Sequence, residues 1–252
     1  MTVTTSFHRI LLDAASAPYR SADRYAWHFS RSKLKRDPMF RTLLEHGVIP
    51  DAQRLVDLGC GQGLLAAWLR SARTLHDAGN WWRDWPAPPL LGQVYGVELM
   101  PKDVERARRA LAGRDVFEVG DIRSAEFGKA DVVVILDVLH YIDYRDQLDL
   151  LRRVRAALPP GGLFVTRIGN AAGGLPFLAG QWVDHVAAFT RGHRLSRLCC
   201  RSTAEWTLLL QQLGFRVDSI PMRGRTSFAN VMLSARVDGP AAPRVGDPDS
   251  MC

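Results

Sequence analysis

Residues 55–65 read LVDLGCGQGLL, and this stretch decides the fold expected of the chain. An apolar run ends in Asp57, glycines follow at alternate positions, and an apolar helical pattern begins at once. This order predicts a buried strand, a tight turn and the N-terminus of a helix, because glycine lets the backbone turn sharply and approach a ligand closely. The glycine spacing is G-x-G-x-G, so Gly63 comes one residue too early for the dinucleotide-binding fingerprint.

Strand and helix patterns alternate along most of the chain. Apolar runs predict strands at residues 54–58, 93–99, 116–119, 130–136, 163–168, 215–220 and 228–237. Helical patterns lie between them, at residues 64–75, 101–111, 145–158 and 202–213. The alternation predicts one doubly wound α/β domain. We expect it to span residues 51–237, after a helical N-terminal cap segment at 1–50. A lid insertion is expected at 169–201, and a disordered tail rich in proline, glycine, alanine and aspartate at 238–252.

Acidic residues end consecutive predicted strands: Asp57, Glu98, Asp121 and Asp137. In a doubly wound sheet, ligands bind in the crevice beyond the carboxyl ends of the strands, so we expect these acids to share one site. If the ligand is a positively charged sulfonium nucleoside, Glu98 can accept both ribose hydroxyls and Asp121 the adenine amine. Asp57 can bond the ligand's amino group or a water and hold the glycine loop.

On these residues the chain resembles the class I S-adenosylmethionine (SAM)-dependent methyltransferases, over about residues 50–237. The resemblance implies a Rossmann-like seven-stranded sheet with an antiparallel last strand, SAM as cofactor, S-adenosyl-L-homocysteine (SAH) as product, and no metal. It assigns cofactor binding to the following residues: Asp57, Leu58, Gly59, Cys60, Gly61, Gly63, Glu98, Leu99, Asp121, Ile122 and Asp137.

The chain departs from the family pattern in two places, and the second departure narrows the substrate class. Residues 76–92 lengthen the usual connection between Asp57 and Glu98. Asp137 lacks the Pro-Pro-aromatic triplet of enzymes that methylate base amino groups, and no proline–cysteine pair typical of cytosine carbon-5 enzymes is found. Base methylation of nucleic acid is therefore disfavoured.

The whole pattern most resembles bacterial small-molecule methyltransferases. Residues 17–20, 135–141 and 171–177 are similar to those of methyltransferases from aryl-polyene or related polyketide pigment pathways. That similarity implies an acceptor carried on an acidic acyl carrier protein.

His140 is the candidate general base, because it follows the strand beside the expected methyl donor and histidine titrates near neutral pH. A histidine that only packs or hydrogen-bonds in its loop is an equally weighted interpretation. The candidate substrate-pocket residues are Tyr25, Tyr141, Arg167, Trp182 and His185. Trp182 and His185 lie on a helix-like segment of the insertion, and for His185 a surface or packing role is favoured.

A cluster of tryptophans occupies a proline-rich loop: Trp81, Trp82 and Trp85. Two interpretations are open. The cluster can form a surface for docking to a partner or a membrane, or it can fold back over the sheet edge as a small satellite core. The second is favoured.

The net charge of +7 at pH 7 comes mostly from arginine and suits acidic partners, although a solvated arginine-rich surface explains it more simply. No run of about 18 apolar residues predicts a transmembrane helix, and the N-terminus lacks the pattern of a secretory signal. The 4 cysteines form no C-x-x-C pair. We therefore expect a cytoplasmic protein that is not an integral membrane protein.

The sequence thus predicts SAM-dependent methyl transfer to a small-molecule or carrier-bound acceptor, by O- or C-methylation of a phenol-like or polyketide-like group. An RNA methyltransferase is one alternative, suggested by the basic charge, although nucleic acid is not the favoured partner. A catalytically silent SAM-fold interaction protein is another. A nucleotide-dependent oxidoreductase is disfavoured by the glycine spacing.

Overall fold

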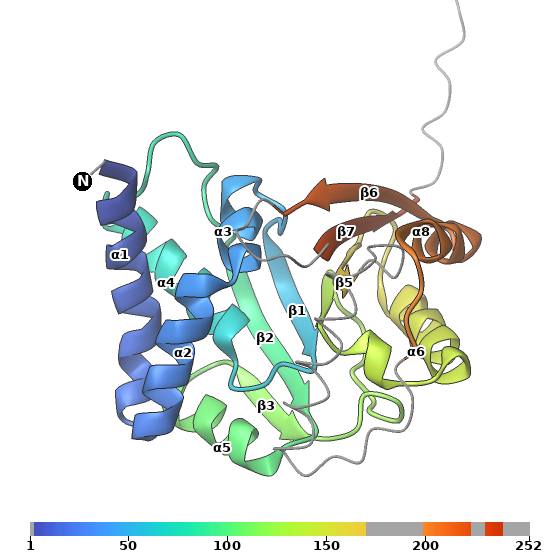
Figure 1. The fold of residues 1–252 in the computed structure, drawn as a ribbon, viewed down its shortest axis with the longest axis horizontal. Coiled ribbons are helices and arrows are strands. Elements are labelled where there is room, and N and C mark those ends of the chain that lie inside the picture. Colours follow the sequence, from blue (N-terminus) through green and yellow to red (C-terminus); the bar gives the residue numbers. More distant parts are fainter. Residues whose placement is uncertain (1–2, 170–198, 223–229, 239–252) are drawn as a thin grey trace, which may run out of the picture.

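A computed structural model describes residues 3–169, 199–222 and 230–238 of the chain. Helical segments come first, and strands and helices then largely alternate (Figure 1). In chain order the elements are α1 (Val3–Ser16), η1 (Ala17–Arg20), α2 (Arg24–Arg36), α3 (Pro38–Glu45), β1 (Ala52–Leu58), α4 (Leu64–Asp77), β2 (Leu91–Glu98), α5 (Pro101–Ala110), β3 (Val116–Val119), β4 (Val132–Leu136), η2 (Leu139–Tyr141), α6 (Tyr144–Ala157), β5 (Leu163–Gly169), α8 (Thr203–Gln212), β6 (Phe215–Pro221) and β7 (Asn230–Val237).

The strands form a 7-stranded sheet in the order β3-β2-β1-β4-β5-β7-β6. Strands β1 to β5 pair in parallel, whereas β7 runs antiparallel to both β5 and β6. The predicted Rossmann-like sheet with an antiparallel last strand is therefore confirmed. Because β1 lies between β2 and β4, the strand order reverses there, and the carboxyl ends of these strands mark the expected ligand crevice.

Each face of the sheet is covered by its own hydrophobic core. Side chains alternate between the faces along a strand, so Val133 of β4 joins one core and Val134 the other. Figure 1 shows α1, α2 and α4 on one side of the sheet, and α6 and α8 on the opposite side. This sandwich of helices keeps the strands buried, as the continuous apolar run in β4 predicts.

The tryptophan loop packs against the first helix. The ring of Phe7 in α1 lies 5.3 Å from that of Trp81 and 5.6 Å from that of Trp85, measured between centroids. Trp82 stacks on Phe7 at 6.3 Å, and Trp85 is buried. The cluster therefore folds back onto the protein, as the favoured interpretation predicts, but it joins the main hydrophobic core beside α1 and does not form a separate core over the sheet edge.

Most of the predicted lid insertion, with Trp182 and His185, lies outside the described residues, as does the tail after Asp238. Their predicted roles stay predictions. Within the described ranges, no helix is both long enough and apolar enough to cross a membrane.

Candidate active site

The glycine turn between β1 and α4 adopts the backbone conformation that the sequence predicts. Gly59, Gly61 and Gly63 have φ angles of 82°, 53° and 73°, in the left-handed region where glycine has no steric penalty. A Cβ atom on Gly59 would lie 2.3 Å from Cγ2 of Val138, whereas one on Gly61 would meet nothing within 4 Å. The turn is therefore packed against the protein at Gly59 and open at Gly61.

Glu98 ends β2 and fastens the glycine turn. Its Oε2 accepts a hydrogen bond from the backbone N–H of Gly61 at 3.0 Å, and its Oε1 accepts one from the N–H of Met100 at 3.0 Å. Each carboxylate oxygen has a further lone pair, so the pair of ribose hydroxyls can still be accepted. The structure brings Glu98 to the glycine turn, as its predicted role requires.

Asp57 is the buried acid of the site. It is 3% exposed, and the described residues offer its carboxylate neither a hydrogen bond nor an ion pair. Burial, together with the nearby charge of Glu98, raises the pKa of Asp57 to about 7. Such an acid is satisfied when a donor or a cation binds beside it.

The N-terminal segment also reaches the glycine turn. Tyr19, on η1, is fully buried, and its hydroxyl donates to the backbone carbonyl of Gln62 at 2.8 Å. On the other side of the turn, Nε2 of Gln62 donates to Asp103 at 3.1 Å. Tyr19 was not among the predicted site residues. The only sequence signal for it was the family resemblance of residues 17–20.

We expect Tyr19→Phe to lower the free energy of unfolding by about 1–3 kcal/mol, because the carbonyl of Gln62 loses its buried partner. Urea unfolding measures this change. Tyr95→Phe is the matched control, since the Tyr95 hydroxyl bonds Glu118 at an exposed position, and a smaller change is expected there. Equal effects of the two substitutions would contradict a clamping role for Tyr19.

The predicted adenine-site residues, Asp121 and Ile122, follow β3, and the predicted cofactor residue Leu99 follows β2. Asp121 accepts hydrogen bonds from the backbone and the guanidinium of Arg123, and these bonds lower the pKa of its carboxyl. Ile122 is buried, whereas Leu99 presents an exposed apolar side chain. An exposed leucine next to Glu98 suits contact with a flat ring.

Two further predicted cofactor residues are buried: Leu58, which ends β1, and Cys60, in the glycine turn. Burial, with the charges of Asp57 and Glu98, raises the pKa of the Cys60 thiol well above its ordinary value, so this cysteine stays neutral.

Asp137 and Arg167 form an ion pair at the ends of β4 and β5. The Arg167 side chain is buried and also pairs with Asp37, whose Oδ1 lies 2.5 Å from its Nη1. Arg167 was predicted to line the substrate pocket, but its guanidinium is held between two carboxylates. A direct contact with substrate would therefore require one of these pairs to open.

His140 and Tyr141 lie together on η2, shortly after Asp137, with ring centroids 4.1 Å apart. The backbone carbonyl of His140 accepts a hydrogen bond from the N–H of Cys199 at 3.0 Å. This bond brings the end of the insertion next to the candidate base.

Tyr25 lies on the surface of α2 and is 54% exposed. Its ring stacks on Phe29 at 5.8 Å, and the guanidinium of Arg106 lies 4.6 Å from its centre. The described contacts of Tyr25 are thus with α2 and α5, and its predicted place in the substrate pocket stays a prediction.

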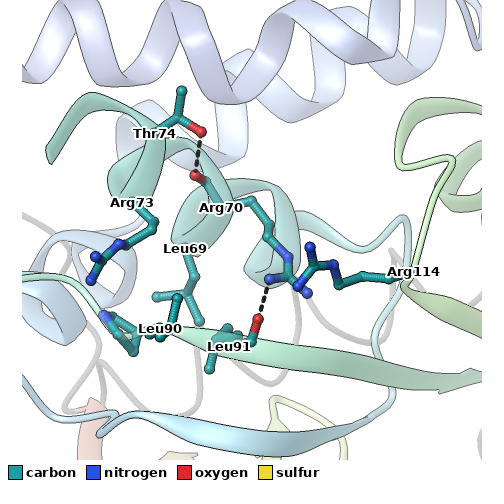
Figure 2. Close-up of a pocket in the computed structure, with 8 residues that line it drawn as sticks. Leu69, Arg70, Arg73, Thr74, Leu90, Leu91 and Arg114 are labelled. Carbon is teal, nitrogen blue, oxygen red and sulfur yellow. Dashed lines mark hydrogen bonds between the residues drawn. The ribbon is translucent and has the colours of Figure 1, made fainter. Parts of the chain in front are cut away.

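A cavity of about 240 Å³ lies at the opposite edge of the sheet, next to Leu91 at the start of β2 (Figure 2). Arg70, Arg73 and Arg114 line it. Arg70 is committed to Asp115 and to the carbonyls of Leu91 and Gly92, so it ties α4 to the strands. This cavity is remote from the acids at the carboxyl ends of the strands and is not the predicted cofactor site. The described residues contain no cluster of three or more histidine, cysteine, aspartate or glutamate side chains that could hold a metal ion.

A family model described as "Methyltransferase domain" matches residues 26–220, which is most of the chain. The chain belongs to this methyltransferase family. The matched range includes the glycine turn, Glu98, Asp137, most of α2 and all of α3.

Curated relatives of this methyltransferase are named carboxy-S-adenosyl-L-methionine synthase. The protein from Chromohalobacter salexigens is 34% identical over 115 residues, which are 43% of this chain and 37% of the relative. The protein from Enterobacter sp. strain 638 is 33% identical over 133 residues, 50% of this chain and 48% of the relative. The chain therefore spans less than half the length of these relatives.

Solved structures of methyltransferases share the fold. An O-methyltransferase family protein from Burkholderia thailandensis has a TM-score of 0.59 at 23% identity, covering 87% of this chain and 62% of its own. Magnesium protoporphyrin IX methyltransferase from Synechocystis, with bound SAH, has a TM-score of 0.54 at 16% identity. The match covers 93% of this chain and 100% of that structure's chain. Human N-acetylserotonin methyltransferase with SAM has a TM-score of 0.55 at 17% identity. The match covers 90% of this chain and 59% of that structure's chain.

The methyltransferase family and SAM as its cofactor are as predicted from the sequence. The site itself fits a cationic nucleoside: Asp57 is a buried acid without a partner in the described chain, and the space above Gly61 is open. The individual binding roles of the predicted residues remain predictions.

Proposed function

We propose that this methyltransferase transfers the methyl group of SAM to a small molecule or to an acyl group held on a carrier protein. The acceptor is a phenol-like or polyketide-like group that is methylated on oxygen or carbon. One observation carries the proposal: Glu98 holds the glycine turn beside the buried acid Asp57, at the carboxyl ends of β1 and β2.

The residues of the crevice bind and orient the reactants. SAM supplies a methyl group on a positively charged sulfur, which makes the methyl reactive toward a nucleophile. Asp57 and Glu98 provide negative charge for the cationic cofactor, and the bare backbone at Gly61 allows close approach. Alignment of two reactants in one site removes roughly 7–11 kcal/mol of barrier in favourable model systems, so no strong base is required.

His140 accepts the proton of an acceptor hydroxyl on its imidazole in this proposal, if the acceptor does not arrive already ionised. Its place on η2, directly after the strand that ends beside the glycine turn, supports that role. The net charge of +7 is complementary to an acidic carrier protein, and this charge supports the carrier-bound form of the acceptor.

The same charge keeps RNA as a second acceptor class to be tested. The names of the curated relatives add a third possibility, a carboxylated form of SAM as product. Forming it needs a carboxylic-acid donor, so it is sought by mass spectrometry in a parallel reaction of SAM with such a donor.

Calorimetric titration with SAM and SAH is the first test, and binding of both is expected. Transfer of labelled methyl from SAM is then measured to simple phenols, to acyl groups on a carrier protein and to RNA. Label is expected on the first or second class, with SAH as co-product. Absence of SAM binding would overturn the proposal at its first step. Label on RNA alone, or a carboxylated SAM without transfer, would overturn the acceptor class.

We expect His140→Ala to lower turnover about 100- to 10,000-fold with a hydroxyl acceptor, while the affinity for SAM stays unchanged. Raising the pH should recover part of the rate, because the acceptor then ionises without help. His76→Ala is the control, since His76 lies at the far end of α4 beside Asp77. Unaltered turnover in His140→Ala would remove only the general-base role.

A further inference from the structure

Four charged side chains meet where the N-terminal helices contact the ends of β4 and β5. They are Lys33 on α2, Asp37 between α2 and α3, Asp137 after β4, and Arg167 on β5. We call them the latch cluster. Two are acids and two are bases, so their formal charges balance.

Arg167 is the centre of the latch cluster. Its side chain is 6% exposed, its Nη1 donates to Oδ1 of Asp37 at 2.5 Å, and its Nε and Nη2 both contact the carboxylate of Asp137. Lys33 completes the set, with its Nζ 2.8 Å from Oδ2 of Asp37 and 3.5 Å from Oδ2 of Asp137. A planar guanidinium is suited to this double recognition, and a lysine amine is not.

Asp37 connects the latch cluster to the N-terminal helices. It ends α2 and caps α3, where its Oδ1 also accepts the N–H of Met39 at 3.0 Å. Burial alone would raise the pKa of Asp37, but Arg167 and Lys33 hold it at about 2. The carboxylate is therefore charged at any ordinary pH, and both helices are tied to β5 through it.

Asp137 connects the latch cluster to the site. Its φ angle is 59°, and no other non-glycine among the described residues has a positive φ. Aspartate tolerates this conformation better than most residues with a Cβ, but it still costs free energy relative to glycine, and surrounding contacts stabilise it. The next residue, Val138, lies so close to Gly59 that a Cβ there would clash, and His140 follows on η2. The turn at Asp137 thus decides where Val138 and His140 lie relative to the glycine turn.

We propose that Arg167 is a positioning residue: it locks Asp137 in its left-handed turn and ties α2 and α3 to the same point, which aligns the glycine turn, Val138 and the His140 segment with one another. The expected effect of Arg167 on SAH affinity rests on the proposed function. Its effect on the conformation of the turn at Asp137 can be measured in the free protein.

The first test compares Arg167→Lys with the wild type. Lysine keeps the positive charge but cannot donate to both carboxylates in the same way. We expect about a tenfold loss of SAH affinity by calorimetry, and faster amide exchange at residues 137–141 and 24–45 of the free protein. Arg109→Lys is the matched control, because Arg109 pairs with Glu105 at an exposed site, and no change is expected. Unchanged amide exchange at 137–141 would overturn the proposal, whether or not the wild type binds SAH.

The second test separates the backbone turn from the carboxylate and does not depend on whether Arg167→Lys folds. Asp137→Ala and Asp137→Gly both remove the carboxylate, but only glycine adopts a φ of 59° without penalty. We expect alanine to lose about tenfold more SAH affinity than glycine. Both variants also lack the carboxylate that Arg167 holds, so faster amide exchange at residues 137–141 is expected in each, and wild-type exchange in both would overturn the proposal. If the wild type binds neither SAM nor SAH, the proposed function fails, and amide exchange in these two variants still decides the role of the turn.

Discussion

Glu98→Ala is expected to weaken SAM binding at least about 100-fold. In the predicted role, the carboxylate accepts two ribose hydroxyls, and a hydrogen bond to a charged group contributes roughly 1.5–3 kcal/mol. The same substitution removes the carboxylate that accepts hydrogen bonds from the N–H groups of Gly61 and Met100, so the conformation of the glycine turn is also less stable. Calorimetric titration with SAM measures the affinity, and urea unfolding checks that the variant is folded.

Two variants sharpen this prediction. Glu98→Gln keeps one acceptor oxygen and the shape of the side chain, so a loss of about tenfold is expected, intermediate between wild type and alanine. Glu118→Ala removes an acid from the neighbouring strand β3, where its partner is the hydroxyl of Tyr95, and should leave the affinity unchanged. If Glu98→Ala binds SAM within about threefold of wild type, the ribose-binding assignment is wrong.

The sheet and the cofactor edge could be predicted because both depend on local patterns. The apolar run of β4 and the glycines after β1 each encode their own conformation, and parallel pairing then brings the strand ends together. The structure accordingly places Glu98 at the turn with Gly61, and Asp57 beneath it.

Contacts between distant segments could not be predicted in this way. Tyr19 meets Gln62, and Arg167 meets Asp37, only after the N-terminal helices have packed on the domain. Neither pair has a spacing rule, because the partners lie on different elements. Arg167 therefore suggested a pocket residue, as an arginine at the end of a central strand does. Its partners are instead Asp37, which caps α3, and Asp137, which the family resemblance assigns to the cofactor.

Asp57→Asn is expected to raise the free energy of unfolding at pH 8 by up to about 4 kcal/mol. The pKa of Asp57 is about 7 in the folded protein against an ordinary value of 3.8, and each pKa unit corresponds to about 1.36 kcal/mol. The folded state holds more protons than the unfolded state between these two values. The contribution of Asp57 to stability is therefore fully present below about pH 4 and is lost as the pH rises to about 7.

Asparagine stays neutral throughout, so its stability should not fall across this window. Urea unfolding at several pH values from 4 to 8 gives the comparison. Asp149→Asn is the control, because Asp149 is an exposed acid on α6 paired with Arg152, and its profile should follow the wild type. Parallel profiles for wild type and Asp57→Asn would contradict the assigned burial of the charge.

Asp57→Asn should also bind SAM more weakly than the wild type. The buried negative charge of Asp57 lowers stability, but the same charge attracts the cationic cofactor. A cation next to Asp57 favours its carboxylate form, so binding at pH 6 should release a proton, and affinity for SAM should rise with pH until about 7. Calorimetry in buffers with different ionisation enthalpies measures the released proton. We expect wild type to release close to one proton at pH 6 and Asp57→Asn to release none. Equal proton release by the two proteins would mean that a group other than Asp57 loses the proton when SAM binds. The proposed role of Asp57 in binding would then be wrong, even if its burial lowers stability.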